Sequence, residues 1–162
     1  MRRRHRQLGF AGSLHFVTAV ARVRGRWFVE PDECRRLLEF FEGYRAKFSV
    51  ECYGYVLMPD HLHAAVYQAE AGSQVSDAIG GFKRMTSLKC RPTEYPGVSL
   101  WRDYFDDVPV PGTEALGTKL EYMFANPVRA GLVKDSLDYE WSAIRDYFER
   151  GTGIVKVTLL KK

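Results

Sequence analysis

Strand-like and helix-like apolar patterns alternate along the chain, and their order admits few folds. β-Branched and aromatic residues predict strands at 13–22, 50–59, 61–68 and, more briefly, 100–105. Apolar residues at helical spacing predict helices at 30–48 and 73–91. The order strand, helix, strand, strand, helix, strand is that of a split βαβ unit. We therefore expect an α+β fold, a ferredoxin-like sandwich in which an antiparallel sheet carries helices mainly on one face.

Two more helical patterns follow. The first covers 112–127, and we expect it to end at Asn126, because a proline disfavours helical geometry at the residue before it. The second covers 139–151, where Gly151 is suited to close a helix. The final segment, 153–162, is compatible with either a strand or a loose tail.

Length and composition predict one globular domain. A chain of 162 residues can bury one sizeable core. We therefore expect a single domain over 1–162, with a basic, flexible arm at 1–12 and a strand or tail at 152–162. Hydrophobic residues make up 46% of the chain, yet no apolar run approaches the ~20 residues that span a bilayer. The basic start lacks the apolar core of a secretory signal, so we expect a soluble, cytoplasmic protein.

The three cysteines do not form a recognisable site. Cys34, Cys52 and Cys90 are odd in number, widely spaced and without a C-x-x-C pair. This pattern argues against both a disulfide framework and a zinc ribbon. We expect them to be small buried hydrophobic residues.

The net charge of +4 is concentrated at the start of the chain. Four arginines account for the whole excess: Arg2, Arg3, Arg4 and Arg6. Two further basic clusters occur, one with Arg22, Arg24 and Arg26, the other with Lys83, Arg84, Lys89 and Arg91. Each alone is compatible with a solvated surface. Together they favour a polyanionic partner, because neutralising phosphates requires neighbouring Lys and Arg side chains.

The segment MPDHLHAAV, 58–66, places His61 and His63 two residues apart on a predicted strand. Side chains alternate across a strand, so both imidazoles lie on one side, about 6 to 7 Å apart along the chain. Such a pair can converge on one ion. A satisfied core or surface role is the alternative. Metalloprotease, serine-hydrolase and phosphate-loop signatures are absent from the sequence.

The segment LEYMFANPVRAGLV, 120–133, offers a second polar pair. Tyr122 and Asn126 are four residues apart, which makes them neighbours on one helix face. The alternative is a core aromatic residue followed by an asparagine that caps a helix end. Arg129 follows closely and could clamp a phosphate. His15, on the first strand, is best interpreted as a polar residue whose hydrogen bonds are satisfied within the fold. Three aromatic residues could stack on nucleic-acid bases, although core packing is the better interpretation for at least two of them: Trp101, Tyr104 and Phe105.

Together, VLMPDHLHAAV and LEYMFANPVRAGLV resemble the single-tyrosine HUH transposases, and more closely their REP-associated tyrosine transposase branch. Further similarity lies in SLHFVTAVAR, LWRDYF and YEWSAIRDYF, so the resemblance covers most of residues 13–148. The H-x-H and Y-x-x-x-N-P-V motifs occur in the family's order, and the combination is more specific than either motif alone.

The resemblance implies a set of roles. His61 and His63 match ligands of a divalent cation, Mg²⁺ or Mn²⁺, Asn126 matches a third ligand through its amide oxygen, and Tyr122 matches the nucleophile. The family acts on single-stranded DNA that carries hairpins and forms a 5′-phosphotyrosine intermediate while releasing a 3′-OH. Some members act as homodimers. We expect Arg2, Arg3, Arg4, Arg6, Lys83, Arg84, Lys89 and Arg129 to contact DNA.

Two other functions are open on the same residues. The chain could be a noncatalytic nucleic-acid-binding regulator, which would bind hairpins regardless of chelators. It could also be a metal phosphodiesterase that uses water, which would hydrolyse DNA without a protein–DNA linkage. Formation of a covalent adduct distinguishes the strand transferase from both.

Overall fold

The computed structural model describes residues 10–23, 25, 27–90, 99–149 and 151–161. Its centre is a four-stranded sheet in the order β2-β3-β1-β4, in which every neighbouring pair is antiparallel. The strands are β1 (Ser13–Val20), β2 (Val50–Met58), β3 (His61–Gln68) and β4 (Asp106–Val110). The expected α+β fold with a split βαβ order is confirmed.

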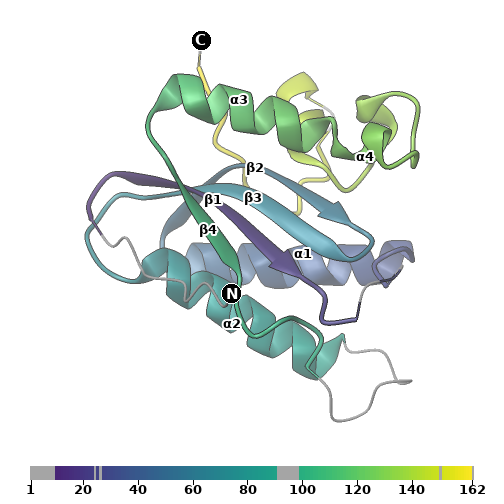
Figure 1. Cartoon of the computed structure of the whole chain (residues 1–162), viewed down its shortest axis with the longest axis horizontal. Helices are drawn as coiled ribbons and strands as arrows, with labels where there is room; N and C mark the ends of the chain where they lie inside the picture. The colour runs from purple at the N-terminus through teal and green to yellow at the C-terminus, as the bar shows by residue number, and fades with distance from the viewer. Residues whose placement is uncertain (1–9, 24, 26, 91–98, 150, 162) are drawn as a thin grey trace.

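Helices cover both faces of the sheet, as Figure 1 shows. The two longest, α1 (Pro31–Lys47) and α2 (Gln74–Lys89), pack side by side on one face, and α3 (Thr113–Phe124) crosses the other. Buried residues at helical spacing explain each attachment, for example Leu116, Leu120 and Met123 of α3. The sandwich therefore has three layers, with α1 and α2 below the sheet and α3 above it.

The fourth strand lies later than predicted. Of residues 100–105, Trp101 forms only an isolated bridge with Ala21, and the ladder with β1 begins at Asp106. The sequence DDVPV concealed this strand, because aspartate and proline are depleted in strands. Pro109 is tolerated because β4 is an edge strand of this sheet, where a missing N–H costs no ladder bond.

The predicted helix at 139–151 is wrong. Ser142 bridges Val56 of β2 instead, and Leu57 N–H donates to the Trp141 carbonyl at 2.8 Å. A 3-10 helix, η2 (Ala143–Phe148), follows, and another, η1 (Ser136–Asp138), precedes it. The apolar residues had helical spacing, but the backbone hydrogen bonds at Ser142 go to β2, which the sequence pattern alone cannot show.

The C-terminal residues strengthen the β2 edge. Val157 pairs with Cys52 in a parallel bridge, and Thr158 N–H donates to the Cys52 carbonyl at 2.8 Å. Over residues 153–161 the structure therefore has bends at 153–155 and a single bridge at Val157, which lies between the two expected alternatives. One hydrophobic cluster includes core residues from Phe16 to Val155. Cys34 and Cys52 are buried in this cluster and Cys90 is partly buried, as expected. Among the described helices, none combines the length and apolar character needed to cross a membrane.

Candidate active site

The two histidines of β3 lie on the face of the sheet that α3 covers, here called the histidine face. Leu62 and Ala64 alternate with them and are fully or almost fully buried toward the opposite face. The rings of His61 and His63 meet edge to face, with their centroids 4.6 Å apart. The strand register thus brings both imidazoles together, as the i, i+2 spacing predicts.

The carboxylate of Asp60 orients His61. Asp60 lies in the turn between β2 and β3, and its Oδ1 is 2.8 Å from Nδ1 of His61. A carboxylate accepts hydrogen bonds, so the ring proton belongs on Nδ1 and the lone pair of Nε2 is left available. That Nε2 lies 3.4 Å from the amide nitrogen Nδ2 of Asn126. An imidazole lone pair and a side-chain amide from two separate elements therefore converge.

His63 is held in its neutral form. Its Nδ1 lies 2.8 Å from the hydroxyl of Thr18 on the neighbouring strand β1, and its ring packs 5.2 Å from that of Phe16. Burial, the neighbouring His61 and the positive charge of Arg129 lower the pKa of His63 to about 3. A neutral imidazole at physiological pH is the form that binds a metal ion.

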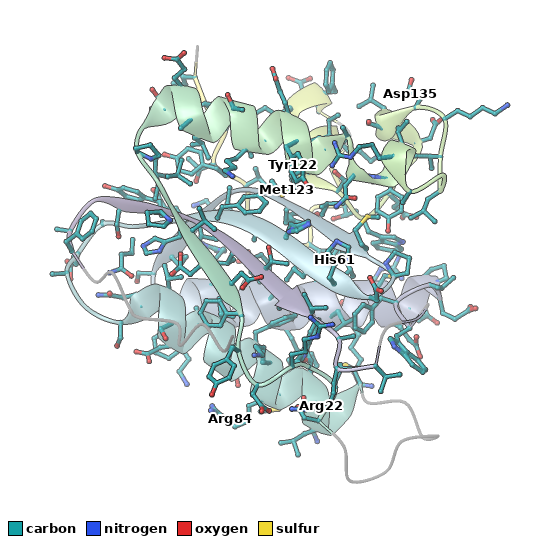
Figure 2. All side chains as sticks on the ribbon, in the orientation of Figure 1. Arg22, His61, Arg84, Tyr122, Met123 and Asp135 are labelled. Carbon is teal, nitrogen blue, oxygen red and sulfur yellow. The ribbon has the colours of Figure 1, made fainter. Side chains whose placement is uncertain are left out.

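Tyr122 lies on the last turn of α3 with its side chain 56% exposed, whereas the next residue, Met123, is completely buried. This exposure excludes the alternative that Tyr122 is a core aromatic residue. Figure 2 shows Tyr122 above the sheet, and His61 contacts Asn126, which follows α3. The phenol therefore faces solvent on the histidine face, where a large substrate can reach it.

Arg129 contacts both the ring and the backbone of Tyr122. It lies in the short helix α4 (Asn126–Arg129), with its guanidinium carbon 4.3 Å from the centroid of the Tyr122 ring. Its Nη2 also donates to the Tyr122 backbone carbonyl at 2.9 Å. Helix α3 ends at Phe124, before the predicted end, and Asn126 begins α4, where Pro127 occupies the first turn. The tight α3–α4 junction thus places Tyr122, Asn126 and Arg129 together.

The donors present suit a divalent cation. Among the described residues, no cluster of three or more His, Cys, Asp or Glu side chains could hold a metal ion. The third donor here would instead be the amide of Asn126, whose oxygen and nitrogen differ only by a flip of the group. With the amide flipped so that its oxygen faces His61, two imidazoles and one amide oxygen would match an ion of intermediate hardness such as Mn²⁺, or Mg²⁺ with further oxygen ligands from water and phosphate.

Of the basic residues named from the sequence, those on α2 that the structure describes lie away from the histidines, whereas Arg129 lies near them. Lys83, Arg84 and Lys89 lie on α2, beyond the opposite face of the sheet. Several others lie outside the described residues: Arg2, Arg3, Arg4, Arg6, Arg24, Arg26 and Arg91. The sequence therefore did not show that Lys83, Arg84 and Lys89 are separated from the candidate site by the sheet, and their contact with DNA stays a prediction.

Most of the other residues singled out in the sequence are buried in the fold. His15 is buried and satisfied by Asp107 at 2.9 Å and Ser13 at 2.8 Å, which confirms the structural interpretation. Trp101 and Phe105 are core residues, and Tyr104 is 37% exposed. Sequence reasoning missed the role of Thr18, because only the pairing of β1 with β3 places it opposite His63.

Comparison with known proteins connects this arrangement to transposases. The family model for IS200-like transposases matches residues 10–107, which include the histidine pair and end before α3. A solved structure of the REP-associated tyrosine transposase bound to a REP hairpin has a TM-score of 0.76 and 19% identity, covering 99% of this chain and 94% of that one. A crystal structure of a candidate transposase from Deinococcus radiodurans R1 has a TM-score of 0.53 and 13% identity, covering 74% and 95%. No curated protein matches the chain in sequence.

The solved structures and the family model support different conclusions about this chain. At such low identities the two solved structures show that the fold is shared, including the part beyond residue 107 in the first of them. The family model covers more than half of the chain and contains β1, α1, β2, β3 and α2. The chain therefore belongs to the IS200-like transposase family.

Proposed function

We propose that this transposase nicks and rejoins single-stranded DNA, with Tyr122 as the nucleophile and His61, His63 and Asn126 as the ligands of Mg²⁺ or Mn²⁺. The observation that carries the proposal is the approach of the Asn126 side-chain amide to within 3.4 Å of Nε2 of His61. The same helical junction presents Tyr122 to solvent. Nucleophile and candidate ligands thus share one face of one chain.

The reaction follows from the chemistry of the phenol. The Tyr122 oxygen attacks the scissile phosphorus, a bond forms between them, and the bond to the 3′ oxygen breaks. The phenol proton passes to solvent, and the departing oxygen takes up a proton to become a 3′-OH. The downstream DNA remains attached through a 5′-phosphotyrosine. A bound divalent cation would supply charge neutralisation at the phosphate.

Arg129 has two tasks in this proposal. Its stacking on the Tyr122 ring and its bond to the Tyr122 carbonyl restrict where the phenol can point. Its guanidinium also offers charge to an approaching phosphate, which is a bidentate partner suited to arginine. The residue therefore both orients the nucleophile and attracts the substrate.

Rejoining uses the same residues in reverse. The covalent link conserves the energy of the phosphodiester, because the aryloxide is a fair leaving group. A 3′-OH from DNA can then attack the phosphotyrosine, release Tyr122 and restore a phosphodiester without ATP. Strand transfer, rather than hydrolysis, is the expected outcome.

The DNA substrate we propose carries a hairpin. Support comes from the similar structure of the REP-associated tyrosine transposase, which is bound to a REP hairpin. We further propose that residues 1–162 act as one domain in the cytoplasm, since α3 and the C-terminal segment share the hydrophobic cluster with the part that matches the family model. A homodimer, which some family members form, is not needed to bring Asn126 to His61, because both residues come from one chain.

A covalent-adduct assay tests the proposal. A panel of hairpin oligonucleotides from DNA flanking the gene is labelled at the 3′ end and incubated with the protein in Mn²⁺. We expect a labelled protein band that survives SDS, whereas a 5′ label should appear in a shortened free strand. Tyr122→Phe should abolish the band and leave DNA binding intact.

Tyr53→Phe provides the matched control, because Tyr53 is a partly exposed tyrosine on β2. It should form adduct at the unmodified rate. An adduct that persists in Tyr122→Phe would assign the nucleophile elsewhere. Hydrolysed product without a protein band would identify a water-using phosphodiesterase, and chelator-insensitive binding without cleavage would identify a noncatalytic regulator.

A further inference from the structure

Lys119 lies on α3 one helical turn before Tyr122. Residues three apart are neighbours on a helix surface, so these two side chains leave the helix close together. The buried residues of α3 are Leu116, Leu120 and Met123. Lys119 is partly buried, whereas Tyr122 is exposed. Lys119 therefore lies between the core side of α3 and the phenol.

The ammonium group of Lys119 reaches down to the histidine face. Its Nζ lies 5.3 Å from the centroid of the Phe16 ring on β1, which is within the range of a cation–π contact. The centroid of the Phe16 ring is in turn 5.2 Å from that of His63. Phe16 is buried, so its ring has a fixed position. One aromatic ring therefore contacts both a lysine of α3 and a proposed metal ligand of β3.

The charge of Lys119 is not matched by a carboxylate. None of the ion pairs formed among the described residues includes it. Its contact with the Phe16 ring is attractive but leaves the positive charge uncompensated. A partly buried charge is stabilised when a group of opposite sign approaches it. The position between Tyr122 and His63 therefore favours an anion.

We propose that Lys119 is a further catalytic residue whose ammonium group contacts a non-bridging oxygen of the scissile phosphate, an inference that rests on the proposed function. A phosphodiester has two non-bridging oxygens. A divalent cation held by His61, His63 and Asn126 would take one of them, and Lys119 takes the other. Lys119 precedes Tyr122 by three residues and Asn126 follows it by four, so the phenol attacks between the two positive charges.

The role of Lys119 differs from that of Arg129. The guanidinium of Arg129 is stacked on the Tyr122 ring and bound to the Tyr122 carbonyl, which restricts its movement. Lysine carries a compact charge on a flexible stem, so it can follow the phosphate as the reaction proceeds. The non-bridging oxygens bear the negative charge of the transition state. A contact that strengthens at this stage raises the rate of cleavage more than the affinity for DNA.

Lys119→Met tests the assignment, with Lys47→Met as the matched control. Methionine keeps an unbranched apolar stem over Phe16 and removes the charge. Lys47 on α1 makes the same kind of contact, since its Nζ lies 5.8 Å from the centroid of the Tyr44 ring and 5.5 Å from that of Phe48. Helix α1 covers the opposite face of the sheet, away from the candidate site (Figure 1). Urea unfolding of both variants shows whether either loses stability.

Cleavage is measured on a hairpin oligonucleotide that the unmodified protein cuts. The shortened 5′-labelled strand is followed, because it appears whether tyrosine or water attacks. At saturating DNA we expect Lys119→Met to cut about 10²- to 10³-fold more slowly than Lys47→Met, the usual loss for one group that stabilises transition-state charge. Lys119→Arg should recover part of this rate. Fluorescence anisotropy in a chelator, which prevents cleavage, should find nearly equal DNA affinities.

A neutral linkage separates a contact with the phosphate from a structural role. In a methylphosphonate, a methyl group replaces one non-bridging oxygen, and the linkage carries no charge. Each of its two diastereomers is placed at the cut site. For at least one of them, the difference in rate between Lys119→Met and Lys47→Met should nearly vanish, because no negative charge remains for Lys119 to stabilise. A lysine that only supports α3 would keep its full effect.

Equal cleavage rates of Lys119→Met and Lys47→Met on ordinary DNA would overturn the inference, and so would a loss confined to DNA affinity. A full difference in rate on both neutral linkages would also overturn it. If neither neutral linkage is cut, the inference fails when Lys119→Arg is as slow as Lys119→Met and stands when it recovers.

The proposed function can fail separately. If the strand is cut without an adduct, Tyr122 is not the nucleophile, and the same comparison of Lys119→Met with Lys47→Met still decides the role of Lys119. If the adduct forms and the two variants cut equally fast, only the assignment of Lys119 fails. If the unmodified protein cuts no DNA, both proposals fail together.

Discussion

At the scale of single residues, Asp60 orients the ring of His61, one of the proposed cation ligands. Its carboxylate lies 2.8 Å from Nδ1 and keeps the proton there. We predict that Asp60→Ala lowers Mn²⁺ affinity by about 10- to 100-fold, since partners of metal-binding histidines typically contribute this much. Isothermal titration with Mn²⁺ measures the effect without requiring catalysis.

Asp60→Asn is the informative companion variant. The amide oxygen can still accept the Nδ1 hydrogen bond, but it lacks the negative charge that makes the imidazole more basic. Its Mn²⁺ affinity should lie between those of the unmodified protein and Asp60→Ala. Unchanged affinity in both variants would show that His61 is not a ligand or that Asp60 does not orient it.

Motifs in the sequence predicted the four proposed site residues, but not the contacts that hold them. The H-x-H spacing implies one shared strand face, and this is confirmed by the edge-to-face contact of His61 and His63. Thr18 could not be found in this way, because its position opposite His63 depends on the pairing of β1 with β3. Arg129 was predicted as a phosphate clamp, and that role stays a prediction. Its stacking on Tyr122 depends on the α3–α4 junction.

At the scale of elements, the sequence likewise could not predict hydrogen bonds between segments that are distant in the chain. Periodicity predicted β1, β2, β3, α1, α2 and α3, because each buries residues at its own repeat. It placed a strand at 100–105, where Trp101 forms only an isolated bridge with Ala21, and it missed β4, whose sequence DDVPV is poor in strand-forming residues. It also predicted a helix at 139–151, where Ser142 bridges Val56 of β2. Such bridges leave no local pattern in the sequence.

The position of α3 depends on one glycine of the sheet. A Cβ at Gly54 would lie 2.6 Å from Leu120 and 3.2 Å from Met123, so α3 approaches β2 closely at this point. We predict that Gly54→Ala lowers the free energy of unfolding by about 1–3 kcal/mol, the usual cost of overpacking a core. It should also slow adduct formation, because α3 carries Tyr122 and leads directly to Asn126.

Gly81→Ala separates these two effects. A Cβ at Gly81 would collide with the Tyr44 ring, which lies between α1 and α2 on the other side of the sheet. This variant should also lose stability in urea unfolding, but it should form adduct at the unmodified rate well below its melting temperature. If Gly54→Ala kept the unmodified rate despite its lower stability, the position of α3 would not control the reaction.

At the scale of the whole molecule, different helices cover the two faces of the sheet. The histidine face carries α3, which leads into α4, whereas α1 and α2 cover the opposite face. The sheet edge at β2 is bridged by Ser142 and Val157. The C-terminal third of the chain therefore packs on the histidine face and on the β2 edge, where α3 and α4 carry Tyr122 and Asn126.

The same architecture predicts that Tyr122 serves the histidines of its own chain. Only Pro111 and Gly112 connect β4 to α3, and Leu120 and Met123 are buried against the sheet of the same chain. An equimolar mixture of Tyr122→Phe with a His61→Ala, His63→Ala double variant should therefore give no SDS-resistant adduct, even at concentrations where a homodimer would form. Fluorescence anisotropy with a labelled hairpin oligonucleotide first establishes that each variant still binds DNA. An adduct in the mixture, absent from either variant alone, would mean that α3 delivers its tyrosine to a partner, and the contact of Asn126 with His61 would then have to form between two copies.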